Sequence, residues 1–186
     1  MYITPHTTIH TTFADIQNFF KDGPGLYWRE NEPLTAAELT RAPRNLIVGE
    51  PGIGKTLLLE QIRNELTALG HPADFLRLKD ETVLAQALAF AEAANGGAAV
   101  LLLDALDEVG THRLPDVLRA LDDLSSKYPA VTLCVSSRWV FINRYADSFH
   151  RYRFITISPF TYDQGCANTL ERPVRQIPRS TLSSSA

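Results

Sequence analysis

One eight-residue segment carries glycines, a lysine and a threonine at a spacing suited to holding phosphate. It fits the pattern G-x-x-x-x-G-K-[S/T] in full. Glycines lack a Cβ, so the backbone can curl and point N–H groups at phosphate oxygens. Lys55 supplies a positive charge for the β- and γ-phosphates, and Thr56 offers a hydroxyl to Mg²⁺. We predict that nucleotide binding involves Gly49, Glu50, Pro51, Gly52, Ile53, Gly54, Lys55, Thr56 and Leu57.

The neighbouring sequence provides the setting that such a loop needs. Leu46, Ile47 and Val48 predict a short buried strand before it. A helix is predicted over residues 55–69, with one apolar stripe and Gly70 as its end. The positive N-terminus of this helix would face the same anion. The alternative, a chance glycine-rich turn, requires neither element.

Three carboxylates follow the apolar run at residues 98–103. Asp104 falls at the strand end, where ligands bind open α/β sheets, so we expect it to hold Mg²⁺ partly through water. Glu108 is the candidate general base that polarises an attacking water. Asp107 either supports Asp104 or is a further candidate metal ligand. The alternative is a solvated acidic turn that caps the next helix.

A third polar element ends the predicted strand at residues 131–135. Ser136, Ser137 and Arg138 follow it directly. Arg138 is placed to sense the γ-phosphate or to stabilise its charge in the transition state, unless it is only a surface arginine near a strand end. The catalytic candidates are therefore Glu108, Lys55 and Arg138.

Strands are predicted to alternate with helices through the middle of the chain, which indicates βαβ units in a three-layer α/β fold with a parallel sheet. The remaining predicted strands cover residues 74–78, 98–103 and 153–157, and the remaining helices cover 81–94, 114–127 and 140–146. We expect three parts: a lead-in with short helices at 1–42, a core at 43–160 and a tail at 161–186.

The two ends differ from the core in composition. In the lead-in, helices are predicted over residues 13–20 and 34–40, the second with Thr35 and Glu38 as a capping box. Tyr27 and Trp28 either stack on a base or pack the lead-in onto the core. The tail is rich in Pro, Arg and Ser, so it is either disordered or not the native continuation of the chain.

Composition excludes several classes of protein. The chain has 186 residues, is 45% hydrophobic and carries a formal net charge of -3. These values exclude collagen, wholesale disorder and binding of nucleic acid by bulk positive charge. Two widely spaced cysteines form no disulfide framework, and no run is long enough for a transmembrane helix. We expect a cytoplasmic protein without membrane or nucleic-acid partners.

Taken together, residues 43–159 resemble the nucleotide-binding core of the NACHT family of STAND P-loop NTPases. The segment from Leu103 to Glu108 carries the most specific likeness, because a small residue follows its first aspartate and an acidic pair comes three positions after that aspartate. The resemblance implies a three-layer αβα P-loop NTPase with a five-stranded, mostly parallel sheet in the order 5-1-4-3-2. It also implies ATP or ADP with Mg²⁺ as cofactors.

What the resemblance implies is a regulated ATPase switch that signals in defence, with weak or regulated turnover of ATP to ADP and phosphate. Family members continue into further sensor and effector domains and self-associate, so we expect this chain to be a C-terminally truncated core. Two alternatives stay open. One is an AAA+-like motor or loader, and the other is a nucleotide-binding interaction module with negligible hydrolysis.

Overall fold

The computed structural model describes residues 6–22 and 32–157 of the chain. Tyr27, Trp28, the turn at 158–160 and the tail at 161–186 lie outside the described residues, so the predictions made for them stay predictions. Among the described residues, no helix is both long enough and apolar enough to cross a membrane.

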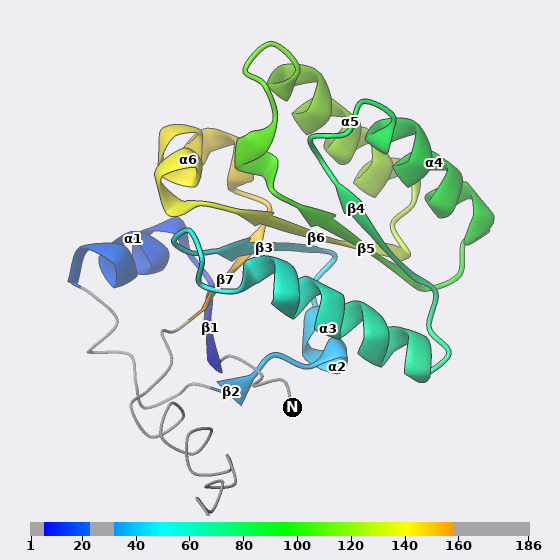
Figure 1. The fold of residues 1–186 in the computed structure, drawn as a ribbon, viewed down its shortest axis with the longest axis horizontal. Coiled ribbons are helices and arrows are strands. Elements are labelled where there is room, and N and C mark those ends of the chain that lie inside the picture. Colours follow the sequence, from blue (N-terminus) through cyan, green and yellow to red (C-terminus); the bar gives the residue numbers. More distant parts are fainter. Residues whose placement is uncertain (1–5, 23–31, 158–186) are drawn as a thin grey trace, which may run out of the picture.

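Five parallel strands form the centre of the sheet, as predicted. Their bounds are Arg44–Val48 (β3), Ala73–Arg77 (β4), Ala99–Asp104 (β5), Val131–Ser137 (β6) and Arg153–Ile157 (β7). Across the sheet they run β7-β3-β6-β5-β4, and each neighbouring pair is parallel (Figure 1). Numbered along the chain, this is the predicted order 5-1-4-3-2. The strands predicted from the residues therefore form, and they lie in the order that the family resemblance implies.

Two further strands enlarge this sheet, so the prediction of five strands was too low. His6–His10 (β1) pairs antiparallel with β7, and the two-residue strand Glu32–Pro33 (β2) pairs antiparallel with β1. The seven strands of the described residues lie in the order β2-β1-β7-β3-β6-β5-β4. The lead-in thus covers the edge of β7, which would otherwise present unpaired backbone groups.

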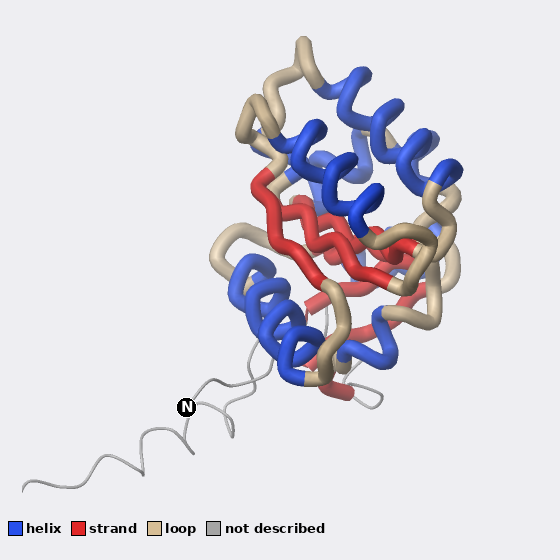
Figure 2. Tube along the Cα trace, turned by 90° about the vertical axis from the view of Figure 1, so that its right-hand side faces the viewer, coloured by secondary structure: helices blue, strands red, loops and turns tan. Residues whose placement is uncertain are grey.

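Helices cover both faces of the sheet (Figures 1 and 2). Ala36–Leu39 (α2) and Lys55–Ala68 (α3) pack on one face. The other face carries Phe13–Asp22 (α1), Val83–Ala93 (α4), Leu114–Lys127 (α5) and Trp139–Arg144 (α6). Because side chains alternate along a strand, Leu46 packs with the second group and Ile47 with the first. Strands β3, β5 and β6 are buried throughout, which explains the continuous apolar run of β5.

The lead-in helices begin at threonine caps. Thr35 Oγ1 accepts from Glu38 N at 3.1 Å, as one half of the predicted capping box. The other half does not form, because Glu38 pairs with Arg153 on β7 at 3.0 Å. A cap that the sequence analysis missed begins α1, where Thr12 and Asp15 each accept from the other's backbone N–H at 3.1 Å. Local caps therefore fix where both helices begin.

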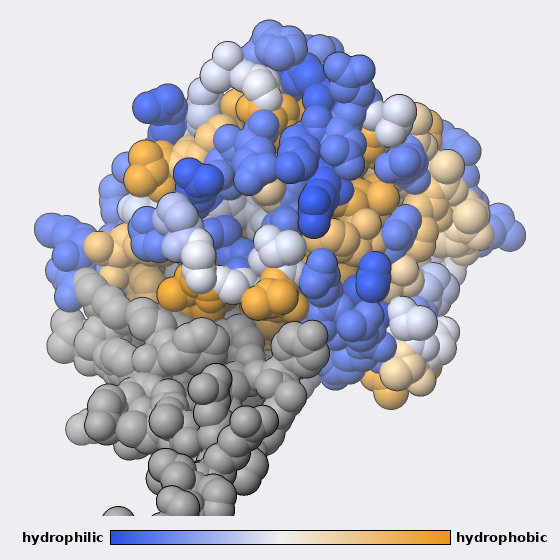
Figure 3. All heavy atoms as spheres, viewed as in Figure 1, coloured by the Kyte–Doolittle hydropathy of each residue, from blue (hydrophilic) through white to orange (hydrophobic). Residues whose placement is uncertain are grey.

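At the far edge of the sheet, β4 pairs only with β5 among the described strands. Its residues are half-buried, apart from the exposed Arg77. Figure 3 shows hydrophobic surface on this side of the molecule, with polar residues around it. The carboxyl ends of β4, β5, β3 and β6 meet at one edge, which is where the predicted functional residues gather.

Candidate nucleotide-binding site

The phosphate loop connects β3 to α3. Its first glycine is held by a hydrogen bond from Gly49 N to Ser137 O at 3.3 Å, and an added Cβ there would lie 2.9 Å from Ile53 Cγ2. Gly52 and Gly54 have φ values of 77° and 99°, which favour glycine. Gly54 is the N-cap of α3 and supplies no side-chain cap. The first N–H groups of α3 are therefore free of side-chain caps, which suits a phosphate.

Lys55 lies at the start of α3 and folds back onto the loop. Its Nζ donates to Gly49 O at 2.8 Å and to Glu50 O at 2.9 Å. Burial lowers the pKa of Lys55 below its ordinary value, while the nearby Asp107 carboxylate opposes this shift. The ammonium group thus rests on carbonyl oxygens that phosphate oxygens could replace.

Thr56 and Asp104 come together as the sequence predicts for a magnesium site. Thr56 Oγ1 donates to Asp104 Oδ2 at 2.8 Å, and Ser136 Oγ donates to Asp104 Oδ1 at 2.5 Å. The hydroxyl and carboxylate are hard oxygen donors, and Mg²⁺ commonly takes one or two protein ligands with water and phosphate. The two donors therefore fit Mg²⁺ beside the phosphate loop. No group of three or more His, Cys, Asp or Glu side chains that could hold a metal occurs within residues 6–22 and 32–157.

A residue in the left-handed conformation separates Asp104 from the other two carboxylates, Asp107 and Glu108. Ala105 has φ 63° and ψ 57°, and the 3-10 turn Leu106–Glu108 follows it. Its N–H donates to Ser136 Oγ at 2.9 Å, and Leu106 is fully buried. After this turn, Asp107 and Glu108 contact residues that follow two different strands, β6 and β4.

Asp107 reaches the end of β6 and pairs with Arg138. Asp107 Oδ2 is 2.8 Å from Arg138 Nε, and Oδ1 accepts from Arg138 N at 3.1 Å. Asp107 therefore contacts Arg138 in this structure, and its role as a metal ligand stays a prediction. Arg138 itself lies beside the loop, as predicted.

Glu108 contacts Lys79, in the segment that follows β4. Its carboxylate is 3.6 Å from Lys79 Nζ, and both side chains are about half exposed. Arg113 fixes the Lys79 segment by donating to the carbonyl oxygens of Lys79 and Asp80, each at 3.0 Å. Sequence reasoning missed Lys79. Its position just after a predicted strand was the available signal, because parallel strands end at one edge.

These residues surround one hollow of about 270 Å³, here called the P-loop hollow. It brings together parts of the phosphate loop with residues from the ends of β4, β5 and β6. Its lining consists of Pro51, Gly52, Lys55, Thr56, Arg77, Lys79, Asp104, Ala105, Asp107, Glu108, Ser136 and Arg138. All three predicted catalytic residues therefore line one site.

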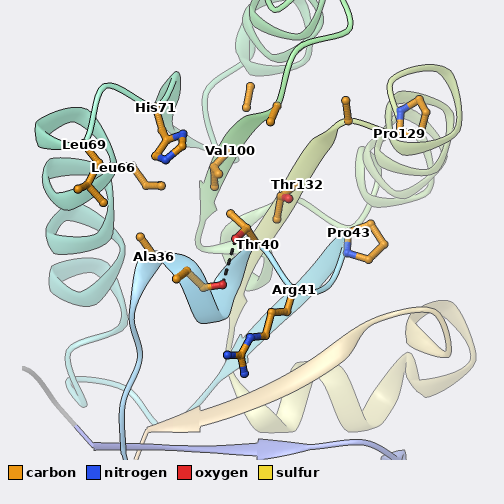
Figure 4. A pocket seen from close by; sticks show the side chains of 14 residues that line it. Ala36, Thr40, Arg41, Pro43, Leu66, Leu69, His71, Val100, Pro129 and Thr132 are labelled. Atoms are coloured by element: carbon orange, nitrogen blue, oxygen red, sulfur yellow. Dashed lines mark hydrogen bonds between the residues drawn. The ribbon is translucent and has the colours of Figure 1, made fainter.

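A larger hollow, of about 510 Å³, lies at the opposite end of the strands (Figure 4). Its polar lining residues are Thr40, Arg41, His71 and Thr132. Thr40 Oγ1 donates to Ala37 O at 3.0 Å, and Arg41 pairs with Glu38 at 2.5 Å. No carboxylate or phosphate-loop residue lines this hollow. The P-loop hollow therefore remains the candidate functional site, although it is the smaller of the two.

Three solved structures with low sequence identity resemble the chain. C. elegans PCH-2 is 15% identical, with a TM-score of 0.46, over 64% of this chain and 36% of that one. The Aeropyrum pernix ORC1 protein, solved in complex with DNA, is 13% identical, with a TM-score of 0.49, over 83% and 47%. Rhizobiales Trip13 is 15% identical, with a TM-score of 0.45, over 81% and 67%. The matches thus span less than half of the first two proteins.

Sequence comparison gives a family. No curated protein matches the chain, but residues 45–158 match the AAA family, the "ATPase family associated with various cellular activities". This region holds the phosphate loop, the carboxylates after β5 and Arg138. Because the match covers more than half of a chain whose fold and phosphate loop agree with it, the chain belongs to the AAA family of ATPases.

Proposed function

We propose that the chain binds Mg·ATP in the P-loop hollow and hydrolyses it, as the ATPase domain of an AAA-type motor or loader. The observation that carries this proposal is that Lys55, Asp104 and Glu108 line one hollow beside the phosphate loop. The family match favours this function over the NACHT-type switch, which the sequence analysis placed first.

Each residue has a role that follows from its position. The loop and the N-terminus of α3 hold the phosphates, and Lys55 supplies a positive charge. Thr56 and Asp104 hold Mg²⁺, which neutralises phosphate charge when it is bound. Glu108 orients and polarises water as general base, with Lys79 steadying its carboxylate. Arg138 contacts the terminal phosphate.

ATP turnover by the purified chain tests these roles. Lys55→Ala should weaken nucleotide binding by at least about tenfold and lower turnover with it. Glu108→Gln keeps the shape of the side chain but removes its basicity, so turnover should fall by about 100-fold or more while binding remains. Glu92→Gln is the matched control, because Glu92 is an exposed acid on α4 outside the P-loop hollow. Equal turnover in all four proteins would refute the proposal.

A regulated STAND-type switch is the second candidate. Between Asp104 and Glu108 lie the left-handed Ala105 and the first two residues of the 3-10 turn, and the resemblance to NACHT proteins rests on this stretch. A switch should retain ADP through purification and turn over slowly even with excess ATP. A motor or loader should exchange ADP freely. Binding of Mg·ATP without any turnover would instead support the nucleotide-binding module. Self-association remains a prediction under all three functions.

A further inference from the structure

Asp107 is much more buried than its neighbour Glu108 and has contacts at both carboxylate oxygens. Its side chain is 9% exposed, against 45% for Glu108. Asp107 Oδ2 pairs with Arg138 Nε, while Oδ1 accepts from Arg138 N and, at 3.4 Å, from Ser137 Oγ. A buried carboxylate needs such partners, because burying an unpaired charge is costly. The partners are confined to two consecutive residues at the end of β6.

The same contacts leave part of Arg138 available. Its side chain is 50% exposed and lines the P-loop hollow. Nε and the backbone N–H of Arg138 contact Asp107, and Nη1 and Nη2 donate no hydrogen bond to any residue in the part of the chain that the structure describes. A guanidinium held at Nε keeps a planar pair of donors for an anion. The ion pair therefore fixes Arg138 without using up its terminal nitrogens.

The backbone on both sides of the ion pair is also fixed. Ser136 contacts both Asp104 and Ala105 N, one residue before the Ser137–Arg138 pair that Asp107 holds. Leu106 anchors the intervening turn in the core. The end of β6 thus connects to the acidic turn at two successive points, so a change at Asp107 should act on Arg138 more than on the fold around it.

We propose that Asp107 is a positioning residue that holds Arg138 for recognition of the terminal phosphate of a nucleoside triphosphate. This inference rests on the proposed function, because it assumes that the triphosphate occupies the P-loop hollow. It assigns Asp107 to Arg138 instead of to the metal.

Calorimetric titration of the chain with ADP or ATPγS, each with Mg²⁺, tests this role without requiring turnover. Asp107→Asn keeps an oxygen for Arg138 N but removes the charge. It should weaken ATPγS binding about tenfold, the size of a lost charged hydrogen bond, and leave ADP binding within about twofold. Arg138→Ala should have the same selective effect, and the double variant should match Arg138→Ala. Asp116→Asn is the matched control, because Asp116 forms an exposed pair with Arg119 at 3.4 Å.

Arg138→Lys provides an independent variant, since lysine keeps the charge but lacks the Nε contact. It should lose the preference for ATPγS, as Asp107→Asn does. Four results would overturn the inference: a wild type with no preference for ATPγS over ADP, an unchanged preference in Asp107→Asn, effects that multiply in the double variant, or recovery of Asp107→Asn at high Mg²⁺. The last result would make Asp107 a metal ligand. A wild type that binds neither nucleotide would refute the proposed function itself, and the inference with it.

Discussion

At the scale of single residues, the site depends on three neighbouring carboxylates that have different partners. Asp104 contacts Thr56 and Ser136, Asp107 pairs with Arg138, and Glu108 pairs with Lys79. The sequence predicted that these acids lie at the carboxyl edge of the sheet. It could not predict their partners, because these depend on the backbone conformation of Ala105 and on strands far away in the sequence.

Ser136 should be the more important of the two serines at the end of β6. Ser136→Ala removes the donor to Asp104 Oδ1 and leaves the Ala105 N–H unpaired, so the free energy of unfolding should fall by about 1–3 kcal/mol. Ser137→Ala is the matched control. Ser137 is equally buried, but its hydroxyl makes one long contact with Asp107. Urea unfolding of both variants measures the difference, and an equal loss would contradict the assigned roles.

Ala105→Gly should not destabilise the protein. An alanine in the left-handed region costs about 1–2 kcal/mol, whereas glycine adopts it freely at a cost of about 1 kcal/mol in the unfolded chain. The variant should therefore be as stable as wild type or up to about 1 kcal/mol more stable. Ala89→Gly, at an exposed position in the interior of the helix α4, should instead lose about 1 kcal/mol. Equal losses in urea unfolding would show that Ala105 is unstrained.

At the scale of elements, the lead-in is part of the structural core. Phe20 of α1 stacks on Trp139 of α6 with ring centroids 4.6 Å apart, and β1 extends the sheet beyond β7. The sequence predicted α1 from its apolar spacing but gave no strand at β1. Ile9 is its only large apolar residue, and it is partly exposed. The β-branched threonines were a signal for a strand, but pairing with the edge of β7 decides whether it forms.

His10 should make the stability of this extension depend on pH. It is 3% exposed, its Nε2 lies 2.9 Å from Thr156 Oγ1, and its ring packs on Phe19. Burial lowers the pKa of His10 to about 4, although the Asp15 carboxylate opposes the shift. Between the ordinary pKa of 6.5 and this value, the unfolded chain binds the proton and the folded chain does not. The stabilisation is therefore present above pH 6.5 and is lost as pH falls toward 4, by up to about 3 kcal/mol.

His10→Gln removes this titration and keeps a hydrogen-bonding side chain. The free energy of unfolding of the variant should depend less on pH between 7 and 5 than that of wild type. His71→Gln, at an exposed position after α3, controls for loss of a histidine and should keep the wild-type dependence. Denaturant unfolding at several pH values measures both. A His10→Gln profile that follows wild type would show that His10 is not the group responsible.

At the scale of the whole molecule, the parallel strands and the two helical layers could be predicted from the residues, and the order of the strands from the family resemblance. Long apolar runs such as residues 99–103 allow few alternatives, because they must be covered on both faces. The two lead-in strands could not be predicted, because each forms only by pairing with another strand in the folded chain. Membership of the AAA family is consistent with the predicted fold, but it favours the motor or loader over the switch.

Equilibrium binding of Mg·ATPγS is the most direct test of the central claim, that the P-loop hollow is a nucleotide site. Wild type should bind one nucleotide per chain, and Glu108→Gln should bind it as well as wild type does. Lys55→Ala should bind at least about tenfold more weakly, as expected for a lost charged contact. Lys127→Ala, which removes an exposed lysine of α5, should bind like wild type. Equal binding by Lys55→Ala and wild type, or no binding by wild type, would contradict the claim.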